Sequence, residues 1–263
     1  IDNDIRTDVL YKLNIKFDVI IHLAASTNVR ESFNNVKEVN DNNINGLYSI
    51  LDYAITSNVK QFIFASSSSV YGENTNYPWK ENDNNLKPIS PYALTKLMGE
   101  QIGYMYSQLY GIRFLSLRFF NVFGPKLRES LLMSKIFEAI KNNTEFEVFG
   151  DGTQSRDFTY IDNVIQANEL AMITPKETIV KHSGLYNMNL PLNASLDLVF
   201  NIAYGGNTTL LQLFDCLRTN LSKFDPEIAS IQPVFGENRK GDIPHSQASI
   251  EKAKRILGYN PQY

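Results

Sequence analysis

The sequence predicts an α/β fold built on a doubly wound parallel sheet. Three apolar runs, at 17–25, 59–66 and 112–124, have the length and the β-branched or aromatic content of buried strands. Helical patterns separate them, at 42–55 and 90–111. Strands that alternate with helices are joined by right-handed crossovers, so we expect these three strands to be parallel neighbours.

The helix at 90–111 carries start and stop signals at its two ends. Ser90 can cap the amino end, Pro91 suits the first turn, and Gly111 suits the stop. In a parallel sheet the amino end of such a helix lies close to the carboxyl end of the preceding strand. That edge of an open α/β sheet is where ligands bind.

The second half of the chain is less regular and predicts a smaller, mixed α/β unit. The expected elements are a helix at 133–142, a strand at 146–150, a strand followed by a helix within 155–172, a strand at 199–206 and a helix at 208–221. The segment 174–198 is polar and rich in asparagine, which indicates a surface excursion.

Composition narrows the class of protein. The 263 residues are 43% hydrophobic with a formal net charge of −3, enough for a sizeable core and too acidic for bulk nucleic-acid binding. No apolar run reaches the roughly 18 residues of a membrane span. The one cysteine, Cys216, lies in an apolar helical pattern and is expected in the core, without a disulfide. These observations predict a soluble, cytoplasmic protein that binds neither nucleic acid nor membrane.

The predicted strand at 59–66 ends in a run of four serines, since residues 62–72 read FIFASSSSVYG. Serine side chains compete for backbone hydrogen bonds and favour turns and caps. The helix that follows carries Tyr92 and Lys96, four residues apart and on one face. A cation beside a phenol favours the phenolate, so the pair can remove a proton from a substrate. In a chain with 14 tyrosines such a pair arises by chance about once, and its convergence with the serines is the more specific observation.

Together these motifs resemble the extended short-chain dehydrogenase/reductases, and among them the NAD-dependent nucleotide-sugar epimerases. The resemblance runs over essentially the whole chain and keeps the family's order of motifs. The matching segments are NDIRTDVL (3–10), VIIHLAA (19–25), NDNNINGLYSIL (40–51), SSSSVYG (66–72), SPYALTK (90–96), RFFNVFGP (118–125), GDGTQSRDFTYIDNV (150–164) and RKGDIPHSQASIEKAKRILGY (239–259). The resemblance implies a Rossmann-like sheet and NAD as the cofactor.

It also implies a division into domains. An incomplete NAD-binding domain would comprise 1–122 and 155–175, a smaller mixed α/β substrate-binding domain 123–154 and 207–263, and a surface excursion with a returning strand 176–206. The family's Gly-rich phosphate loop, G-x-x-G-x-x-G, does not occur in this sequence. About 50 residues, with two strands and two helices, are therefore expected ahead of Ile1.

The resemblance assigns roles in catalysis and cofactor binding residue by residue. Ser67 matches the family's catalytic Ser/Thr, Tyr92 its acid/base, and Lys96 the partner that also holds the nicotinamide ribose. The positions that match cofactor contacts are Asp4 and Ile5 at the adenine, Leu23, Ala24 and Ala25 beneath the cofactor, Asn43 in support of the site, and Tyr92 and Lys96 themselves.

The positions that match substrate contacts are Ser67, Ser68, Ser69, Asn121, Phe149, Arg156, Arg239 and Asp242. The planar fork of an arginine suits a diphosphate. A single arginine is more often a solvated surface charge, but within SRDF and RKGD we expect Arg156 and Arg239 to hold UDP. Phe149 is expected near the uracil, although an aromatic residue in a short strand is as often part of the core.

Ser68 and Ser69 distinguish between reactions. In related dehydratases these two positions resemble Asp-Glu, which supply the acid and base for elimination of water. Hydroxyls cannot ionise for that step, so we expect an isomerase, a 4-epimerase that works through a 4-keto sugar. The most similar members convert UDP-N-acetylglucosamine to UDP-N-acetylgalactosamine, or their uronic acids, for surface polysaccharide biosynthesis.

The motifs are also compatible with two other functions. A UDP-glucuronate or UDP-glucose 4-epimerase is the near alternative, and a catalytically inactive nucleotide-sugar-binding relative is the more distant one. The expected partners are a UDP-sugar and a second copy of the chain in a homodimer, and no metal is expected.

Overall fold

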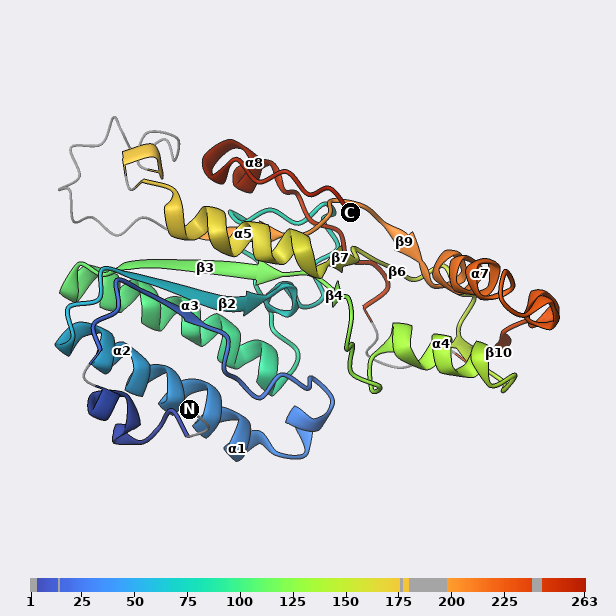
Figure 1. The fold of residues 1–263 in the computed structure, drawn as a ribbon, viewed down its shortest axis with the longest axis horizontal. Helices are drawn as coiled ribbons and strands as arrows, with labels where there is room; N and C mark the ends of the chain where they lie inside the picture. Colours follow the sequence, from blue (N-terminus) through green and yellow to red (C-terminus); the bar gives the residue numbers. More distant parts are fainter. Residues whose placement is uncertain (1–3, 14, 176, 180–197, 238–242) are drawn as a thin grey trace.

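A parallel sheet forms the centre of the larger lobe (Figure 1). The computed structural model describes residues 4–13, 15–175, 177–179, 198–237 and 243–263. Within these residues the sheet has four strands in the order β1-β2-β3-β8, with bounds of Val19–His22, Gln61–Ser67, Arg113–Phe119 and Val199–Ile202. Each neighbouring pair is parallel, which confirms the predicted doubly wound α/β fold.

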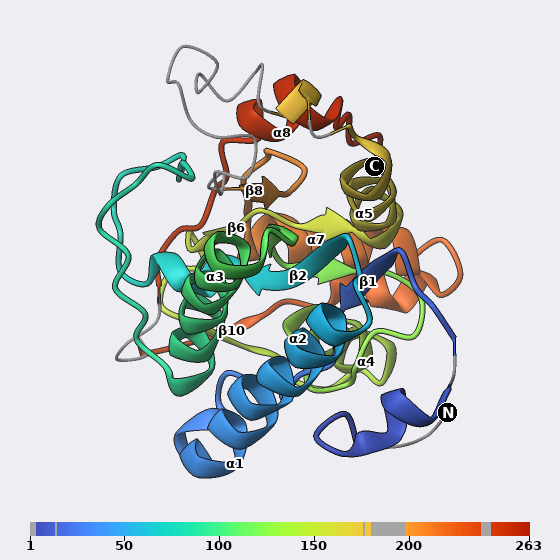
Figure 2. The same cartoon turned by 90° about the vertical axis from the view of Figure 1, so that its left-hand side faces the viewer.

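Helices cover both faces of this sheet. Figures 1 and 2 show α2 and α3 on one face and α5 and α8 on the other, with bounds of Gly46–Thr56, Pro91–Tyr110, Ile161–Ile173 and Glu251–Leu257. Successive side chains of β2 alternate between the two sides. Phe62 and Phe64 pack with α2 and α3, whereas Ile63 packs with α5 and α8. The continuous apolar run at 59–66 therefore reflects burial on both faces.

The long helix α3 begins and ends where the sequence predicts. Ser90 Oγ accepts a backbone hydrogen bond at 3.1 Å, and Gly111 takes the left-handed conformation, with φ of 71°, at the C-cap. Gly99 and Gly103 allow α3 to lie directly on the sheet, since a Cβ on Gly103 would come within 2.0 Å of the Phe114 ring. This close packing fixes the first turns of α3 relative to the end of β2.

The remaining elements are short. In chain order they are η1 (Asp8–Leu13), η2 (Glu31–Phe33), α1 (Val36–Asn40), η3 (Asp41–Asn45), η4 (Ser68–Tyr71), β4 (Val122–Phe123), α4 (Leu132–Lys141), β5 (Glu147–Phe149), β6 (Ser155–Arg156), β7 (Thr159–Tyr160), β9 (Thr208–Thr209), α7 (Leu210–Leu221), η6 (Pro226–Ser230) and β10 (Val234–Gly236). The helix predicted at 42–55 is part of a longer helical stretch, of which η3 is a π-helical turn.

A second core builds the smaller lobe. The helices α4 and α7 and the parallel pair of β5 and β10 enclose Ile136, Val148 and Phe214. Cys216 of α7 is exposed, so the prediction of a core cysteine is wrong. The apolar stripe of α7 runs through Leu213 and Phe214, and Cys216 projects to one side of it.

The last helix, α8, lies on the larger lobe (Figure 1). Ala253 and Ile256 share a core with Phe200 of β8, although the sequence assigns 207–263 as a whole to the substrate-binding unit. The division into domains stays a prediction, and most of the predicted excursion, 180–197, lies outside the described residues. None of the helices that are described is both long and apolar enough to cross a membrane.

Candidate active site

A cavity of about 1000 Å³ lies at the carboxyl ends of β1, β2 and β3 and extends to the smaller lobe. It brings together eight of the residues that the sequence singles out: Leu23, Ser67, Ser68, Ser69, Tyr92, Lys96, Asn121 and Arg156. Leu132 and Met133, at the start of α4, form part of its other side. The predicted catalytic serine, tyrosine and lysine thus share one cavity.

The serine run, Ser66 to Ser69, both ends a strand and begins a turn. Ser67 is the last residue of β2 and the N-cap of η4, and its Oγ accepts hydrogen bonds from the Ser69 amide at 3.2 Å and the Ser69 hydroxyl at 2.9 Å. Ser66 is buried and donates its hydroxyl to the Glu100 carboxylate. All four serines, Ser66 to Ser69, line the cavity.

Lys96 is buried in this wall. Its Nζ donates to the Ala65 carbonyl oxygen at 2.8 Å and lies 5.0 Å from the centre of the Phe64 ring. Burial lowers the pKa of Lys96 to about 8. An ammonium group has three hydrogens to donate, so Lys96 can bind hydroxyls in the cavity while it holds Ala65.

Tyr92 lies one turn before Lys96, with the centre of its ring 5.8 Å from the lysine Nζ. Burial raises the pKa of Tyr92, while the hydrogen bond with Ser67 and the charge of Arg128 both lower it by less. Burial is the largest of these effects on the phenol, and the part that Lys96 plays in its ionisation stays a prediction. The cation that acts on the phenol is Arg128.

Asn43 connects the loop after β1 to the first turn of α3. Its Oδ1 accepts from the Ser26 amide at 2.7 Å, and its Nδ2 donates to the Ser26 carbonyl oxygen at 3.1 Å and to Thr95 Oγ1 at 2.9 Å. Thr95 Oγ1 in turn donates to the Tyr92 carbonyl oxygen at 2.8 Å. The π-helical turn η3 carries Asn43, which is buried, so the predicted supporting asparagine lies directly behind Tyr92.

Asn121 and Arg156, two of the predicted substrate contacts, line the same cavity. Arg156 Nη1 donates to the carbonyl oxygens of Ser155 at 2.8 Å and Pro244 at 3.3 Å. These bonds orient the guanidinium group at the wall. Two other predicted contacts, Arg239 and Asp242, lie outside the described residues.

The cavity also contains residues that the sequence analysis does not single out, among them Arg30, Glu73, Arg128 and Ser246. Ser246 Oγ is buried and has no hydrogen-bond partner among the described residues. Arg128 comes three residues after the RFFNVFGP motif, and Ser246 lies within RKGDIPHSQASIEKAKRILGY. Their nearness to quoted motifs is the only signal that a sequence offers for them.

The predicted adenine contacts lie apart from this cavity. Asp4 accepts a hydrogen bond from Arg6 Nε at 2.9 Å. The side-chain and backbone hydrogen bonds from Arg6 lower the pKa of Asp4 to about 2. Arg6 also pairs with Asp41 of η3, and Ile5 packs against Gly46 at the start of α2. Ala24 and Ala25 follow Leu23 in the loop after β1.

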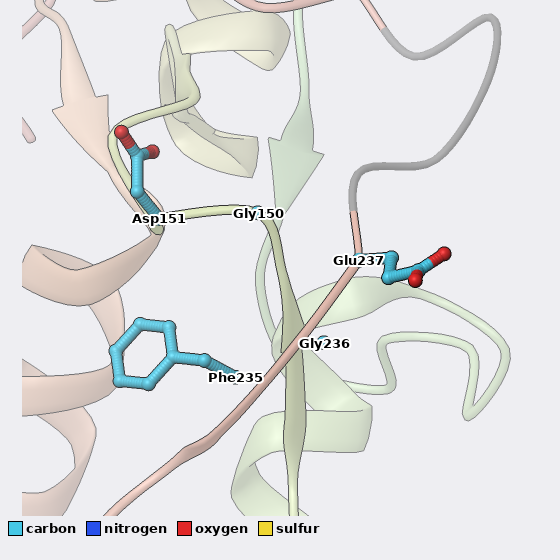
Figure 3. Close-up of a pocket in the computed structure, with 5 residues that line it drawn as sticks. All are labelled: Gly150, Asp151, Phe235, Gly236 and Glu237. Atoms are coloured by element: carbon cyan, nitrogen blue, oxygen red, sulfur yellow. The ribbon is translucent and has the colours of Figure 1, made fainter.

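Phe149 ends β5, and its carbonyl oxygen accepts from Gln154 Nε2 at 2.7 Å. The next residue, Gly150, borders a second cavity of about 700 Å³ between β5 and β10. Figure 3 shows the side chains of Asp151, Phe235 and Glu237 at this cavity directed away from one another. They form no converging set of reactive groups, so the first cavity is the candidate active site.

The residues at the carboxyl ends of the strands fit one half of a nicotinamide cofactor. Lys96 offers buried donors to ribose hydroxyls, and Leu23 gives an apolar surface to a nicotinamide ring. No cluster of three or more His, Cys, Asp or Glu that could hold a metal ion occurs in the part of the chain that the structure describes.

Comparison with known proteins agrees with this geometry. A model of the NAD dependent epimerase/dehydratase family matches residues 2–188. Protein CapI of Staphylococcus aureus is 31% identical over 93% of this chain and 71% of that protein, and UDP-glucuronate 4-epimerase 4 of Arabidopsis thaliana is 34% identical over 96% and 56%. The structure of the UDP-N-acetylglucosamine 4-epimerase from Methanobrevibacter ruminantium M1, in complex with UDP-N-acetylmuramic acid, superposes with a TM-score of 0.83 at 32% identity, over 100% of this chain and 77% of that one.

The chain belongs to the NAD dependent epimerase/dehydratase family. The predicted family of nucleotide-sugar epimerases, the isomerase class and NAD as the cofactor are thereby confirmed.

Proposed function

We propose that this chain catalyses the NAD-dependent 4-epimerisation of a UDP-hexose whose sugar is an N-acetylhexosamine or its uronic acid. The observation that carries the proposal is the convergence of Ser67, Tyr92 and Lys96 on one cavity. Ser68 and Ser69 favour epimerisation over dehydration, because uncharged hydroxyls bind a sugar but supply neither the acid nor the base of an elimination.

In this reaction Tyr92 acts as the acid/base. Its Oη takes the proton of the sugar's 4-hydroxyl and later returns it to the 4-keto oxygen. Ser67, which lowers the pKa of the Tyr92 phenol, orients the 4-hydroxyl for this transfer. Lys96 binds the nicotinamide ribose, and Arg128 favours the phenolate by its charge. Bound NAD supplies the acceptor and donor of the hydride at the 4-carbon.

The remaining predicted residues are proposed as binding residues. Asn121 and Arg156 line the cavity, which supports a role in binding the UDP group. Arg239, Asp242 and Phe149 complete the proposed set by resemblance. The residues proposed for the cofactor are Asp4, Ile5, Leu23, Ala24, Ala25 and Asn43.

The Ser246 hydroxyl favours a substrate whose sugar carries a polar substituent. Its buried hydroxyl lines the cavity without a partner among the described side chains and backbone groups, and a buried hydroxyl that stays unpaired is costly. The acetamido group of an N-acetylhexosamine offers both a donor and an acceptor to this hydroxyl.

A second candidate substrate is UDP-glucuronate. Arg128 places a guanidinium group in the same cavity as Tyr92, where it can pair with the carboxylate of a uronic acid. The similarity to a protein named UDP-glucuronate 4-epimerase 4 also favours this candidate.

A panel of sugars tests both candidates. The full-length, NAD-loaded protein is incubated with UDP-GlcNAc, UDP-glucuronate or UDP-glucose, and the 4-epimers are separated by chromatography. We expect a 4-epimer to form without net production of NADH. In Arg128→Gln the preference for the uronate over the N-acetylhexosamine, measured as the ratio of kcat/KM, falls roughly 10-fold or more, as loss of a charge-assisted bond predicts. A 4-keto-6-deoxy product, or no product from any of the sugars, contradicts the proposal.

We infer that the protein forms a homodimer through the outer face of α3. Leu94, Met98, Met105 and Leu109 lie on one stripe of this helix and are between 38% and 65% exposed. A groove beside this stripe is lined by Leu94, Met98 and residues of α1 and η3. A two-fold contact would bury the stripe of one copy against that of the other.

A further inference from the structure

We propose that the buried ion pair of Glu100 and Arg118 is a positioning device for the serine run. It would hold both ends of the turn that carries Ser67, and so keep the Ser67 hydroxyl against Tyr92. The inference rests on the proposed function, since it assumes that Ser67 and Tyr92 act on the substrate.

The pair itself is bidentate and enclosed. Arg118 Nε donates to Glu100 Oε1 at 2.9 Å and Nη2 to Oε2 at 2.7 Å, with both side chains only 3% exposed. Burial of such a pair often adds little net stability compared with apolar side chains of similar volume. A role in fixing geometry accounts for its presence better than a role in stability.

The carboxylate holds the first end of the serine run. Ser66 Oγ donates to the same Glu100 Oε1 that accepts from Arg118. Ser66 and Ser67 are adjacent in β2 and point to opposite faces of the strand. Both residues line the cavity, and a bond that fixes Ser66 restrains the position of the adjacent Ser67.

The guanidinium group holds the second end. Arg118 Cζ lies 4.8 Å from the centre of the Tyr71 ring, a cation–π contact. Tyr71 is the last residue of η4, and its Oη donates to Asn201 Oδ1 of β8 at 2.7 Å. Ser66 and Tyr71 thus bracket the four residues between them, and both contact the one ion pair.

The same ion pair is also tied to the catalytic helix. Glu100 lies one turn after Lys96 on α3, and Lys96 Nζ donates to the Ala65 carbonyl oxygen next to Ser66. Two bonds therefore join α3 to the end of β2, one through Lys96 and one through Glu100. Movement of Ala65 and Ser66 relative to α3 requires these bonds to break.

The test uses two mild variants with matched controls. Ser66→Ala removes the bond to Glu100, and Tyr71→Phe removes the bond to Asn201 while it keeps the ring beside Arg118. Their controls, Ser107→Ala and Tyr106→Phe, remove bonds of the same kind on the far half of α3, to the Ile112 carbonyl oxygen at 2.8 Å and to Asp52 Oδ1 at 2.7 Å.

In the full-length, NAD-loaded enzyme we expect kcat to fall about 10-fold or more in each test variant, with little change in KM. Small displacements of reacting groups lower the rate by factors of this size. The pH profile of kcat should move to higher pH, because the Ser67 bond that lowers the pKa of Tyr92 is loosened. The two controls should change neither value. Parallel changes in test and control variants, or wild-type kcat in both test variants, would overturn the proposal.

Hydrogen exchange separates this inference from the proposed function. Peptides that cover 62–72 should exchange faster in Ser66→Ala and Tyr71→Phe than in the wild type, and at the wild-type rate in the two controls. This readout needs no substrate, so a protein inactive on every UDP-sugar would refute the proposed function and leave the positioning measurable. Unchanged exchange in both test variants would refute the positioning.

Discussion

At the scale of single residues, Tyr92 has the surroundings of an acid/base and a pKa that burial alone moves the wrong way. We predict that Tyr92→Phe keeps the fold and lowers kcat by roughly 10²–10⁴, the range for loss of general acid–base catalysis. Turnover and thermal unfolding of the full-length enzyme check this. Tyr104→Phe, the same change at an exposed position of α3, serves as control and should leave both quantities unaltered. Equal kcat in the two variants would refute the role of Tyr92.

Asp157, next to Arg156, is a buried carboxylate that joins separate segments of the chain. Its Oδ1 accepts from the Gly205 amide and its Oδ2 from the Ala248 amide, each at 3.1 Å. Burial raises the pKa of Asp157 to about 6, against the backbone bonds, which lower it by less. The charged form of Asp157 is therefore less favourable in the folded protein than in the unfolded chain.

This shift predicts a dependence of stability on pH. Because the folded pKa of about 6 lies above the unfolded value of 3.8, the folded protein retains a proton that the unfolded chain has lost between these values. The contribution of Asp157 to the free energy of unfolding is thus full below about pH 4 and declines as pH rises to about 6. Denaturant unfolding of the wild type and Asp157→Asn over this range measures it. The difference in stability between the two should decrease with rising pH, and a constant difference would argue against the shift.

At the scale of elements, α3 depends on glycine for its contact with the sheet. An alanine at 103 would bring a methyl group to within 2.0 Å of the Phe114 ring. Overpacking of this kind costs about 1–3 kcal/mol, which exceeds the gain of about 1 kcal/mol in helix propensity. We expect Gly103→Ala to lower the free energy of unfolding by up to about 2 kcal/mol, which is the difference between the two effects. Urea unfolding tests this, with Gln101→Ala on the exposed face as control; equal stability of the two variants would show that the ring yields without cost.

The long elements could be predicted from the sequence because their signals are local. The cap and stop of α3 and the apolar run of β2 lie within the segments that they define. The two-residue strands β6 and β7 carry no such pattern, since their pairing with β9 and β4 depends on distant segments. The π-helical turn η3 likewise has no local signature in the sequence.

The candidate site divides in the same way. Ser67, Tyr92 and Lys96 could be found because each stands in a motif of fixed spacing, and the topology brings their segments together. Arg128 lies in the segment that leads into α4, and Ser246 lies in a segment whose backbone bonds to Ser155, so both reach the cavity through tertiary packing and not through a local motif. The rise that burial causes in the pKa of Tyr92 could not be predicted from the sequence, because burial is a property of the assembled protein.

At the scale of the whole molecule, the cavity lies where two separately packed lobes meet. One core holds the sheet with α5 and α8, and another holds α4, α7 and the β5–β10 pair. The sequence order does not reveal that α8 returns to the sheet, because its apolar pattern would suit either lobe. Tyr92 stands on α3, which packs on the sheet, whereas Arg128 lies in the segment that leads into α4 of the smaller lobe.

The last prediction concerns the proposed homodimer. If the stripe on α3 is buried between two copies, Met98→Glu places a charge in an apolar contact on both sides of the two-fold axis. A central interface residue is worth about 2 kcal/mol or more, so we expect Kd for dimerisation to rise roughly 30-fold or more. Sedimentation or light scattering over a range of concentrations measures this.

The control is Ile165→Glu, on α5 at the opposite face of the sheet, where the isoleucine is 48% exposed. It adds the same charge to the surface and should leave the dimer intact. A monomeric wild type would refute the dimer, and a wild-type dimer that Met98→Glu leaves unchanged would place the interface away from α3. Since α3 also carries Tyr92 and Lys96, burial of its outer face would steady the catalytic helix from the side opposite the sheet. We therefore expect the monomeric Met98→Glu variant to lose kcat as well.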